Sequence, residues 1–147
     1  MKKILLIAAF ATGTCLADTT PFMVSLVTPV QAPDRDVDVT GLRLDFIYGQ
    51  SHDFKGLDIG VVNHTTGNFY GVALGGANLV NEEFYGVQMG LLNWNDNGNR
   101  AWAQMSYGAQ VGLVNYADSF CGYQGGLVNI IANNGWMPVF PIVNGSF

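Results

Sequence analysis

The chain has 147 residues, of which 49% are hydrophobic and only 12% are charged, and its formal net charge is −5. Nucleic-acid binding is excluded as a prediction, because phosphate contacts need clustered Lys and Arg, and this chain is acidic. The length is sufficient for one domain with a hydrophobic core.

Residues 1–17 have the features of a bacterial secretory signal peptide. Lys2 and Lys3 form a basic start, residues 4–10 are apolar, and small residues lead up to Ala17. The apolar run is too short for a membrane-spanning helix, which needs about 20 residues. We therefore expect export, followed by a single all-β repeat domain over residues 18–147. Only Cys121 follows the leader, so an internal disulfide is not possible in that domain.

An acidic segment precedes the repeats. Asp34, Asp36 and Asp38 alternate, so they share one face of an extended chain. Carboxylates at alternating positions begin a calcium loop of the EF-hand type. The glycine and the distal Glu of that loop are absent, which favours a solvated acidic loop over a metal site.

Residues 54–132 contain five copies of one phrase, which reads Gly, three residues, Gly, two residues, Asn. Its first glycines are separated by 15, 15, 22 and 14 residues, and weaker copies stand at 41–48 and 137–144. The repeat positions, which we expect to be structural, are Gly56, Gly60, Asn63, Gly71, Gly75, Asn78, Gly86, Gly90, Asn93, Gly108, Gly112, Asn115, Gly122, Gly126 and Asn129. A unit of about 15 residues fits one strand with a turn, or one small solenoid coil.

Each phrase alternates with period two, which predicts a strand. One face is aliphatic in the middle, and the opposite face carries Gly, a small or polar residue, and Gly again. In the third copy the first face has Tyr85, Val87, Met89, Leu91 and Asn93, and the second has Phe84, Gly86, Gln88, Gly90, Leu92 and Trp94. The long spacer at residues 95–99 contains Asn97–Gly98, a strong hairpin signal. No helical period follows the leader, so the fold class is all-β.

The first architecture that we predict is an antiparallel meander closed into a small eight-stranded barrel. Its strands are residues 22–30, 41–48, the five phrases and 137–147, and eight is the smallest usual number for an outer-membrane barrel. The aliphatic face would meet lipid, and the Gly–Gln–Gly face would fill a narrow interior. The terminal Phe147 resembles the closing signal of such barrels.

The alternative is a parallel β-solenoid with about 15 residues per coil. The repeat Asn residues would then stack as a ladder, and the aliphatic face would form the core. Identical direct repeats favour the solenoid, whereas the hairpin-type turns and the step of 22 residues favour the meander.

The phrases resemble the tandem unit Gly-Leu-Gln-x-Gly-Leu-x-Asn of an uncharacterised group of bacterial exported surface-repeat proteins. The similarity covers residues 22–147, and the copies with Gln88, Gln110 and Gln124 match best, whereas Asp58 and Ala73 replace that Gln in the first two copies. The resemblance implies a location in the cell envelope and no catalytic residues.

We therefore predict a non-enzymatic structural or interaction protein of the bacterial cell envelope, at the outer membrane or cell surface. The partner would be outer-membrane lipid or another envelope protein. Alternatives are a small-ligand-binding or pore-type barrel, and a soluble periplasmic or secreted solenoid. An enzyme is disfavoured: the only histidines are His52 and His64, and Ser51, His52 and Asp53 are consecutive, so they cannot face one another as a triad. We predict no catalytic, cofactor-binding or metal-binding residues, and the oligomeric state stays open.

Overall fold

A computed structural model describes residues 19–27, 30–32, 34, 36–96 and 106–146. The signal peptide expected at residues 1–17, the hairpin at Asn97–Gly98 and the terminal Phe147 lie outside the described residues. Within the part of the chain that is described, no helix is both long and apolar enough to cross a membrane.

The described chain is built from β-strands, which confirms the all-β prediction. The strands are β1 (Thr19–Val27), β2 (Val30–Ala32), β3 (Asp38–Ser51), β4 (Phe54–Thr65), β5 (Phe69–Val80), β6 (Phe84–Met89), β7 (Leu92–Asn95), β8 (Ser106–Val111), β9 (Val114–Ala117), β10 (Phe120–Ile131) and β11 (Val139–Ser146). The weaker repeat copies also form strands, since 41–48 lies in β3 and most of 137–144 lies in β11.

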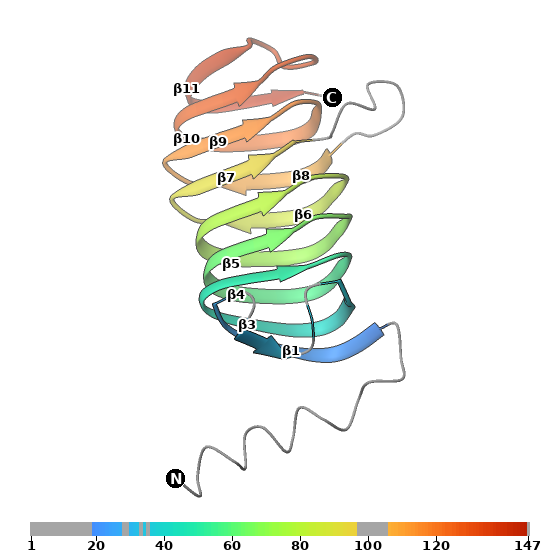
Figure 1. The fold of residues 1–147 in the computed structure, drawn as a ribbon. Helices are drawn as coiled ribbons and strands as arrows, with labels where there is room; N and C mark the ends of the chain where they lie inside the picture. The colour runs from blue at the N-terminus through green and yellow to red at the C-terminus, as the bar shows by residue number, and fades with distance from the viewer. Residues whose placement is uncertain (1–18, 28–29, 33, 35, 97–105, 147) are drawn as a thin grey trace, which may run out of the picture.

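The strands wind into a parallel β-solenoid, in which each coil stacks on the preceding one (Figure 1). Successive coils begin at Val39, Phe54, Phe69, Phe84, Ser106 and Phe120. Each coil runs out along one layer, turns a corner, and returns along a second layer; β6 and β8 belong to the first layer, and β7 and β9 to the second (Figure 1).

The predicted antiparallel barrel is therefore wrong, and its alternative, the solenoid with about 15 residues per coil, describes the fold. Equivalent residues of successive repeats pair in parallel and in register, as Gly56 does with Gly71 and Asn63 with Asn78. The Asn, Asp and Gly residues between the phrases permit a sharp change of direction. That property serves the corner of a coil as well as it serves a hairpin, so the turn residues did not discriminate between the two architectures.

The first, second and fifth phrases each lie in one strand, as predicted, but the even alternation is wrong, and the third and fourth phrases are divided into two strands. In the third copy β6 ends at Met89 and β7 begins at Leu92, with the corner at Gly90 and Leu91. The corner shifts the alternation, so Gln88 and Asn93 are both buried although they are five positions apart, an odd number that would put them on opposite faces of an even strand. Leu91 and Met89 are both exposed on the outside.

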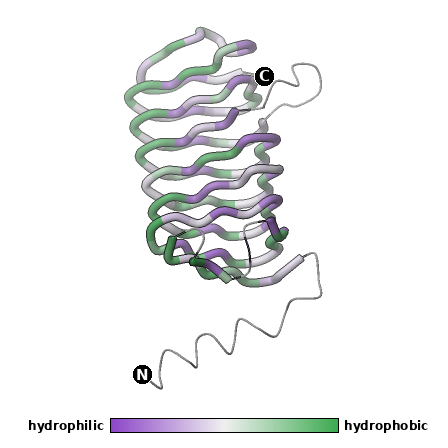
Figure 2. Tube along the Cα trace, viewed as in Figure 1, coloured by the Kyte–Doolittle hydropathy of each residue, from purple (hydrophilic) through white to green (hydrophobic). Residues whose placement is uncertain are grey.

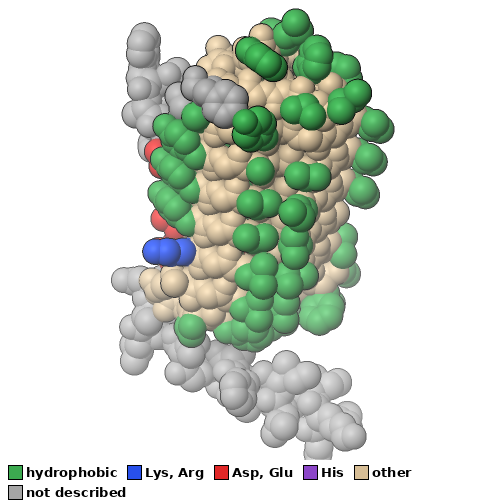
Figure 3. All heavy atoms as spheres, turned by 180° about the vertical axis from the view of Figure 1, so that it is seen from behind, with side chains coloured by type: hydrophobic (Ala, Val, Ile, Leu, Met, Phe, Trp, Pro, Cys, Tyr) green, Lys and Arg blue, Asp and Glu red, His purple; other side chains and the backbone are tan. Residues whose placement is uncertain are grey.

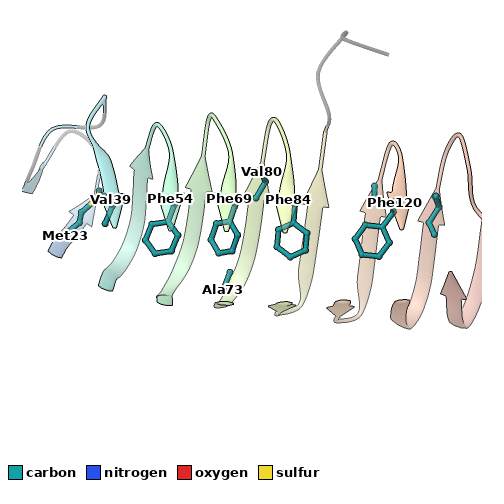
Figure 4. Packing of buried hydrophobic residues seen from close by; sticks show 10 residues of the cluster. Met23, Val39, Phe54, Phe69, Ala73, Val80, Phe84 and Phe120 are labelled. Carbon is teal, nitrogen blue, oxygen red and sulfur yellow. The ribbon is translucent and has the colours of Figure 1, made fainter. Parts of the chain in front are cut away.

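The solenoid interior is mostly polar and aromatic, with a few aliphatic side chains such as Val39, Val80 and Ile131, which corrects the expectation that the aliphatic face of the phrases forms the core. Phe54, Phe69 and Phe84 are almost completely buried and stack with ring centroids 5.1 and 5.5 Å apart. Figure 4 shows these rings in a row, one from each coil, with Phe120 further along. The repeat Asn and Gln side chains fill two further columns, and another buried column holds Thr65, Val80, Asn95, Ala117 and Ile131. The aliphatic side chains within the phrases face outwards, and the hydropathy colouring shows an apolar edge along the corners of the coils (Figure 2).

The first glycine of each phrase makes this narrow coil possible. Gly56 and Gly71 have φ values of 141° and 146°, a region that L-residues with a side chain rarely adopt. A Cβ atom on Gly71 would also overlap the carbonyl oxygen of Gly56 in the preceding coil. This position therefore accepts no other residue without a shift of the backbone.

The two ends of the solenoid use different pairing. β1 lies parallel to β3 and antiparallel to the short β2. At the other end β11 folds back antiparallel to β10. Asn129, the last Asn of the repeat, is covered there by β11, because its Nδ2 donates to the carbonyl oxygen of Phe140 at 3.1 Å.

Candidate functional site

The repeat asparagines form a continuous ladder inside the solenoid. The Nδ2 atom of Asn63 donates to Oδ1 of Asn78, and Nδ2 of Asn78 donates to Oδ1 of Asn93 in the same way. The series continues through Asn115 to Asn129, with donor–acceptor distances of 2.7 to 2.9 Å along the ladder. Each of these amides also donates to a backbone carbonyl, such as that of Met89 for Asn78. All five side chains are buried, so in this fold they hold coils together and offer no surface for a ligand.

A second ladder runs through the glutamines in the opposite direction. Gln124 Nε2 donates to Gln110 Oε1 at 2.7 Å, and Gln110 Nε2 donates to Gln88 Oε1 at 3.0 Å. The series stops at Gln88, because the equivalent residue of the preceding coil is Ala73. The Nε2 atom of Gln88 is buried and has no hydrogen-bond acceptor in the structure.

Charged groups replace these amides in the first two coils. Arg43 and Asp58 occupy the Gln column, and both are buried. Arg43 Nε donates to Asp58 Oδ1 at 2.8 Å, and Arg43 Nη2 donates to the second carboxylate oxygen. Arg43 Nη1 also donates to the hydroxyl oxygen of Ser51 at 2.6 Å and to the carbonyl oxygen of His64 at 3.1 Å. The bidentate geometry gives each oxygen of the Asp58 carboxylate a donor.

Asp45 is a second buried carboxylate beside the same guanidinium. Its Oδ2 lies 3.2 Å from Arg43 Nε, but that N–H is directed at Asp58, and Asp45 accepts no hydrogen bond. Burial raises the pKa of Asp45 from 3.8 to about 7, the positive charge of Arg43 opposes this, and the charge of Asp58 adds to it. Burial also raises the pKa of Asp58, against the attraction and the hydrogen bond of Arg43.

Asp45 stands at the start of the Asn ladder. The first coil carries Gly49 at the Asn position and Asp45 at the position of the second repeat glycine. A Cβ atom on Gly49 would overlap the Asp45 carboxylate, so this carboxylate fills the space of the missing amide. Asn63 Oδ1 at this end of the ladder has no donor. Asn63 Oδ1 and the Cβ atom of Asp45 both adjoin the space that a Cβ atom on Gly60 would take, so the two side chains are neighbours. The raised pKa of Asp45 favours its protonated form, which has an O–H to donate.

A cluster of Asp38, His52 and Asp53 lies at the turn between the first two coils, with potential metal-ligand atoms all within 4.8 Å of one another. Its carboxylates already accept backbone N–H groups: Asp38 from Asp53 at 3.1 Å, and Asp53 from Asn68 at 2.7 Å. Asn68 accepts from Glu83 in the same manner. This repetition along the turns indicates a structural role for these side chains. The segment Asp34–Asp38, predicted to be a solvated loop, thus ends at a residue whose carboxylate accepts a backbone hydrogen bond from Asp53.

The outer surface carries a strip of apolar side chains, which we call the apolar ridge. It consists of the outward residues on both sides of the corner opposite the polar turns. Its members between residues 54 and 131 are Leu57, Ile59, Val61, Val62, Val72, Leu74, Ala77, Val87, Met89, Leu91, Leu92, Ala109, Val111, Leu113, Val114, Leu127 and Val128. Figure 3 shows columns of hydrophobic side chains along the molecule, with acidic and basic groups gathered near the other edge. Val61, Leu91 and Leu127 at the corner are 55%, 63% and 67% exposed.

Aromatic side chains border the ridge on both sides. Tyr70, Tyr85 and Tyr107 stack in a row on the first layer, with centroid distances of 5.0 and 5.1 Å. Trp94 and Tyr116 stack on the second layer at 4.0 Å. These rows separate the aliphatic surface from the turns that carry Asn and acidic residues.

The remaining candidate residues of the sequence are dispersed. Ser51 is buried against Arg43, whereas His52 is exposed, so the consecutive Ser51, His52 and Asp53 do not converge as a triad. His64 Nδ1 forms a hydrogen bond with Tyr48 Oη at 2.6 Å, and burial lowers the pKa of His64. Cys121 is a free, partly exposed thiol in the row that continues from Tyr107.

The sequence interpretation missed the charged cluster of Arg43, Asp45 and Asp58. The signal that could have found it is the alignment of the repeats, since Arg43 and Asp58 stand where later copies carry Gln. The exposed apolar ridge was missed as well, because the aliphatic face was assigned to the core in the solenoid.

Comparison with protein-family models, with curated proteins and with solved structures finds no match for this chain.

Proposed function

We propose that this protein is a non-enzymatic structural or interaction protein of the bacterial cell envelope, associated with the outer membrane or the cell surface. The observation that carries the proposal is the apolar ridge. A solvated protein rarely exposes a contiguous apolar patch of this extent, and larger patches mark contacts with proteins or membranes. The resemblance of the repeats to exported surface-repeat proteins and the leader-like residues 1–17 support the envelope location.

The polar interior supports a structural role. Polar and charged side chains that could take part in chemistry, such as Arg43, Asp58 and Gln110, are buried and hydrogen-bonded to other interior side chains. In a solenoid each coil contacts its neighbours, and stability accumulates along the stack. The described exterior thus offers an extended surface for docking, which suits an interaction protein better than an enzyme.

Cell fractionation tests this proposal. The full chain is expressed in a Gram-negative bacterium, and cytoplasm, periplasm, inner membrane and outer membrane are separated. We expect the protein in the outer-membrane fraction, with residues 1–17 removed as judged by the mass of the purified chain. Recovery as a free periplasmic or secreted monomer would favour the alternative of a soluble solenoid. Recovery in the cytoplasm with residues 1–17 intact would contradict the envelope location.

A further inference from the structure

We propose that the apolar ridge is a lipid-binding surface, by which the solenoid lies along a membrane with the corner of each coil in the interface. This inference rests on the proposed function and names the partner of the envelope protein. The ridge extends from the coil of Val61 to that of Leu127, four coil steps, which is about 20 Å at the usual strand spacing.

The first argument is the chemistry of the ridge. None of its outward positions carries a charged side chain in the coils from Phe54 to Ile131 of the described structure. A protein partner is usually fixed in register by hydrogen bonds and charges at a rim around an apolar centre. The ridge presents a mainly aliphatic surface over several coils, without polar groups that would fix a partner at one position. Such a surface suits lipid, which needs no fixed alignment with the protein.

The second argument is that N–H groups of the corner backbone are paired within the solenoid. The N–H of Leu91 donates to the carbonyl oxygen of Gly76 at 2.9 Å, that of Leu113 donates to Leu91 at 3.0 Å, and that of Val128 donates to Leu113 at 2.9 Å. Unpaired backbone groups are very costly in hydrocarbon. These corners can therefore enter an apolar medium without leaving those N–H groups unsatisfied.

The third argument is the arrangement of aromatic and charged groups around the ridge. Tyr and Trp side chains favour the boundary between hydrocarbon and water, because they combine an apolar ring with a polar atom. The rows of Tyr70, Tyr85 and Tyr107 and of Trp94 and Tyr116 stand at this boundary when the corner dips into the membrane. Acidic residues such as Glu82 and Asp118 lie on the turns at the opposite corner and remain in water.

The shape of the ridge favours lipid over a second copy of the chain. The ridge is the outside of a corner, so it is convex, and two convex corners bury little area against each other. A stable dimer needs roughly 800 Å² from each partner. A membrane interface adapts to the corner and surrounds it on both sides.

The test is flotation of the full chain with vesicles of a zwitterionic phosphatidylcholine. The ridge variant carries Leu91→Ser, Leu113→Ser and Leu127→Ser, and the control variant carries Asn81→Ser, Ala132→Ser and Asn133→Ser at the opposite turns. Any contribution of residues 1–17 is common to the three proteins. All six altered side chains are exposed, so both variants are expected to melt within a few degrees of the wild type.

We expect wild type and control to float with the vesicles and the ridge variant to bind at least about tenfold more weakly, because it loses three large apolar contacts with lipid. Equal flotation of all three proteins would overturn the proposal. So would absence of wild-type binding, and sedimentation would then show whether the wild type forms a dimer that the ridge variant does not. A protein that fractionates with the outer membrane in cells but does not bind these vesicles leaves the envelope function intact and removes only the lipid as its partner.

Discussion

The first coils and the later coils have the same backbone fold, but different polar side chains fill their interiors. In the later coils the interior is a stack of amides, such as Gln110 and Asn115, whereas the coils of residues 39–68 hold Arg43, Asp45 and Asp58. A carboxamide both donates and accepts, so each one can serve the coil above and the coil below. A guanidinium only donates and a carboxylate only accepts, so neither can serve both neighbouring coils. The Asn ladder ends beside Asp45, whereas the Gln ladder already ends one coil before Asp58, at Ala73. The difference teaches that an amide column can propagate from coil to coil, whereas a column of charged groups cannot.

The largest expected effect comes from removing the cation of the charged interior. Arg43→Gln leaves Asp45 and Asp58 buried without their partner, and breaking a buried ion pair costs about 3–5 kcal/mol. Denaturant unfolding at pH 8 measures the loss. The double variant Arg43→Gln with Asp58→Gln extends the amide column into these coils and is expected to recover part of it. A double variant no more stable than the single one would contradict the idea that amides and charges are alternative fillings of one column.

The two interiors should also respond differently to pH. The pKa of Asp45 is about 7 in the folded protein and about 3.8 in the unfolded chain, so the folded state binds the proton more tightly. The contribution of Asp45 to stability is therefore greatest below about pH 4, falls as the pH rises to about 7, and is constant above that. Each pH unit of this interval is worth about 1.4 kcal/mol, which gives at most about 4 kcal/mol. The raised pKa of Asp58 acts in the same direction.

Asp45→Asn isolates this contribution, because an amide beside Asn63 does not titrate and carries N–H donors at every pH. We expect the variant to match the wild type near pH 4 and to be more stable at pH 8 in denaturant unfolding. Parallel pH profiles of the two proteins would show that Asp45 does not titrate in this interval.

A glycine of the amide region tests how tightly the narrow coil is packed. A Cβ atom on Gly90 would overlap the carbonyl oxygen of Gly75 and lie 2.8 Å from Asn78 Nδ2. We expect Gly90→Val to destabilise by about 1–3 kcal/mol, as overpacked interiors do. Gln88→Ala should cost less, since the preceding coil already accommodates Ala73 in that column. Thermal melts compare the two, and equal melting temperatures would mean that the Gly90 side of the coil is uncrowded.

The sequence predicted the strands, the coil length as an alternative and the Asn ladder, because these follow from the period of the repeats. It did not predict which face is inside. Leu91 and Asn93 share a face of an evenly alternating strand, but the corner at Gly90 separates them. The usual assignment of aliphatic residues to the core then failed. A coil of 15 residues has little interior volume, and stacked amides and phenylalanine rings such as that of Phe54 occupy most of it.

The charged cluster was missed for a related reason, although alignment of the repeats places Arg43 and Asp58 in the Gln column. Asp45 and Asp58 come from different coils and meet Arg43 only when the repeats stack in register. In the antiparallel meander that the hairpin signals favoured, the same residues would not share one column. The geometry of the charged cluster therefore depends on the choice between solenoid and meander, which the turn residues did not decide.

A smaller effect is expected when one rung of the Asn ladder is removed. Asn93→Ala removes the hydrogen bonds to Asn115 Oδ1 at 2.7 Å and to the carbonyl oxygen of Val111 at 3.0 Å, so both acceptors lose a buried donor. We expect a loss of about 1–2 kcal/mol, and the same for Asn115→Ala. Asn133→Ala is the control, because its bond to Asp118 is exposed. Unchanged thermal melts of the two ladder variants would contradict their structural role.

The smallest expected effect is a gain, and it tests whether the amide interior can be propagated towards the charged one. Gln88 Nε2 is buried without an acceptor, and Ala73 separates it from Asp58 in the same column. The new carboxamide of Ala73→Gln would accept from Gln88 and donate to the Asp58 carboxylate, which joins the two regions through one ladder. One added net hydrogen bond is worth about 1 kcal/mol of stability. Val72→Gln, which places the same amide on the outer surface, is the control and should show no gain in thermal melts. A lower melting temperature for Ala73→Gln would mean that the column at this coil is too small for a second amide, so that the boundary between the two interiors is set by space and not by hydrogen bonding.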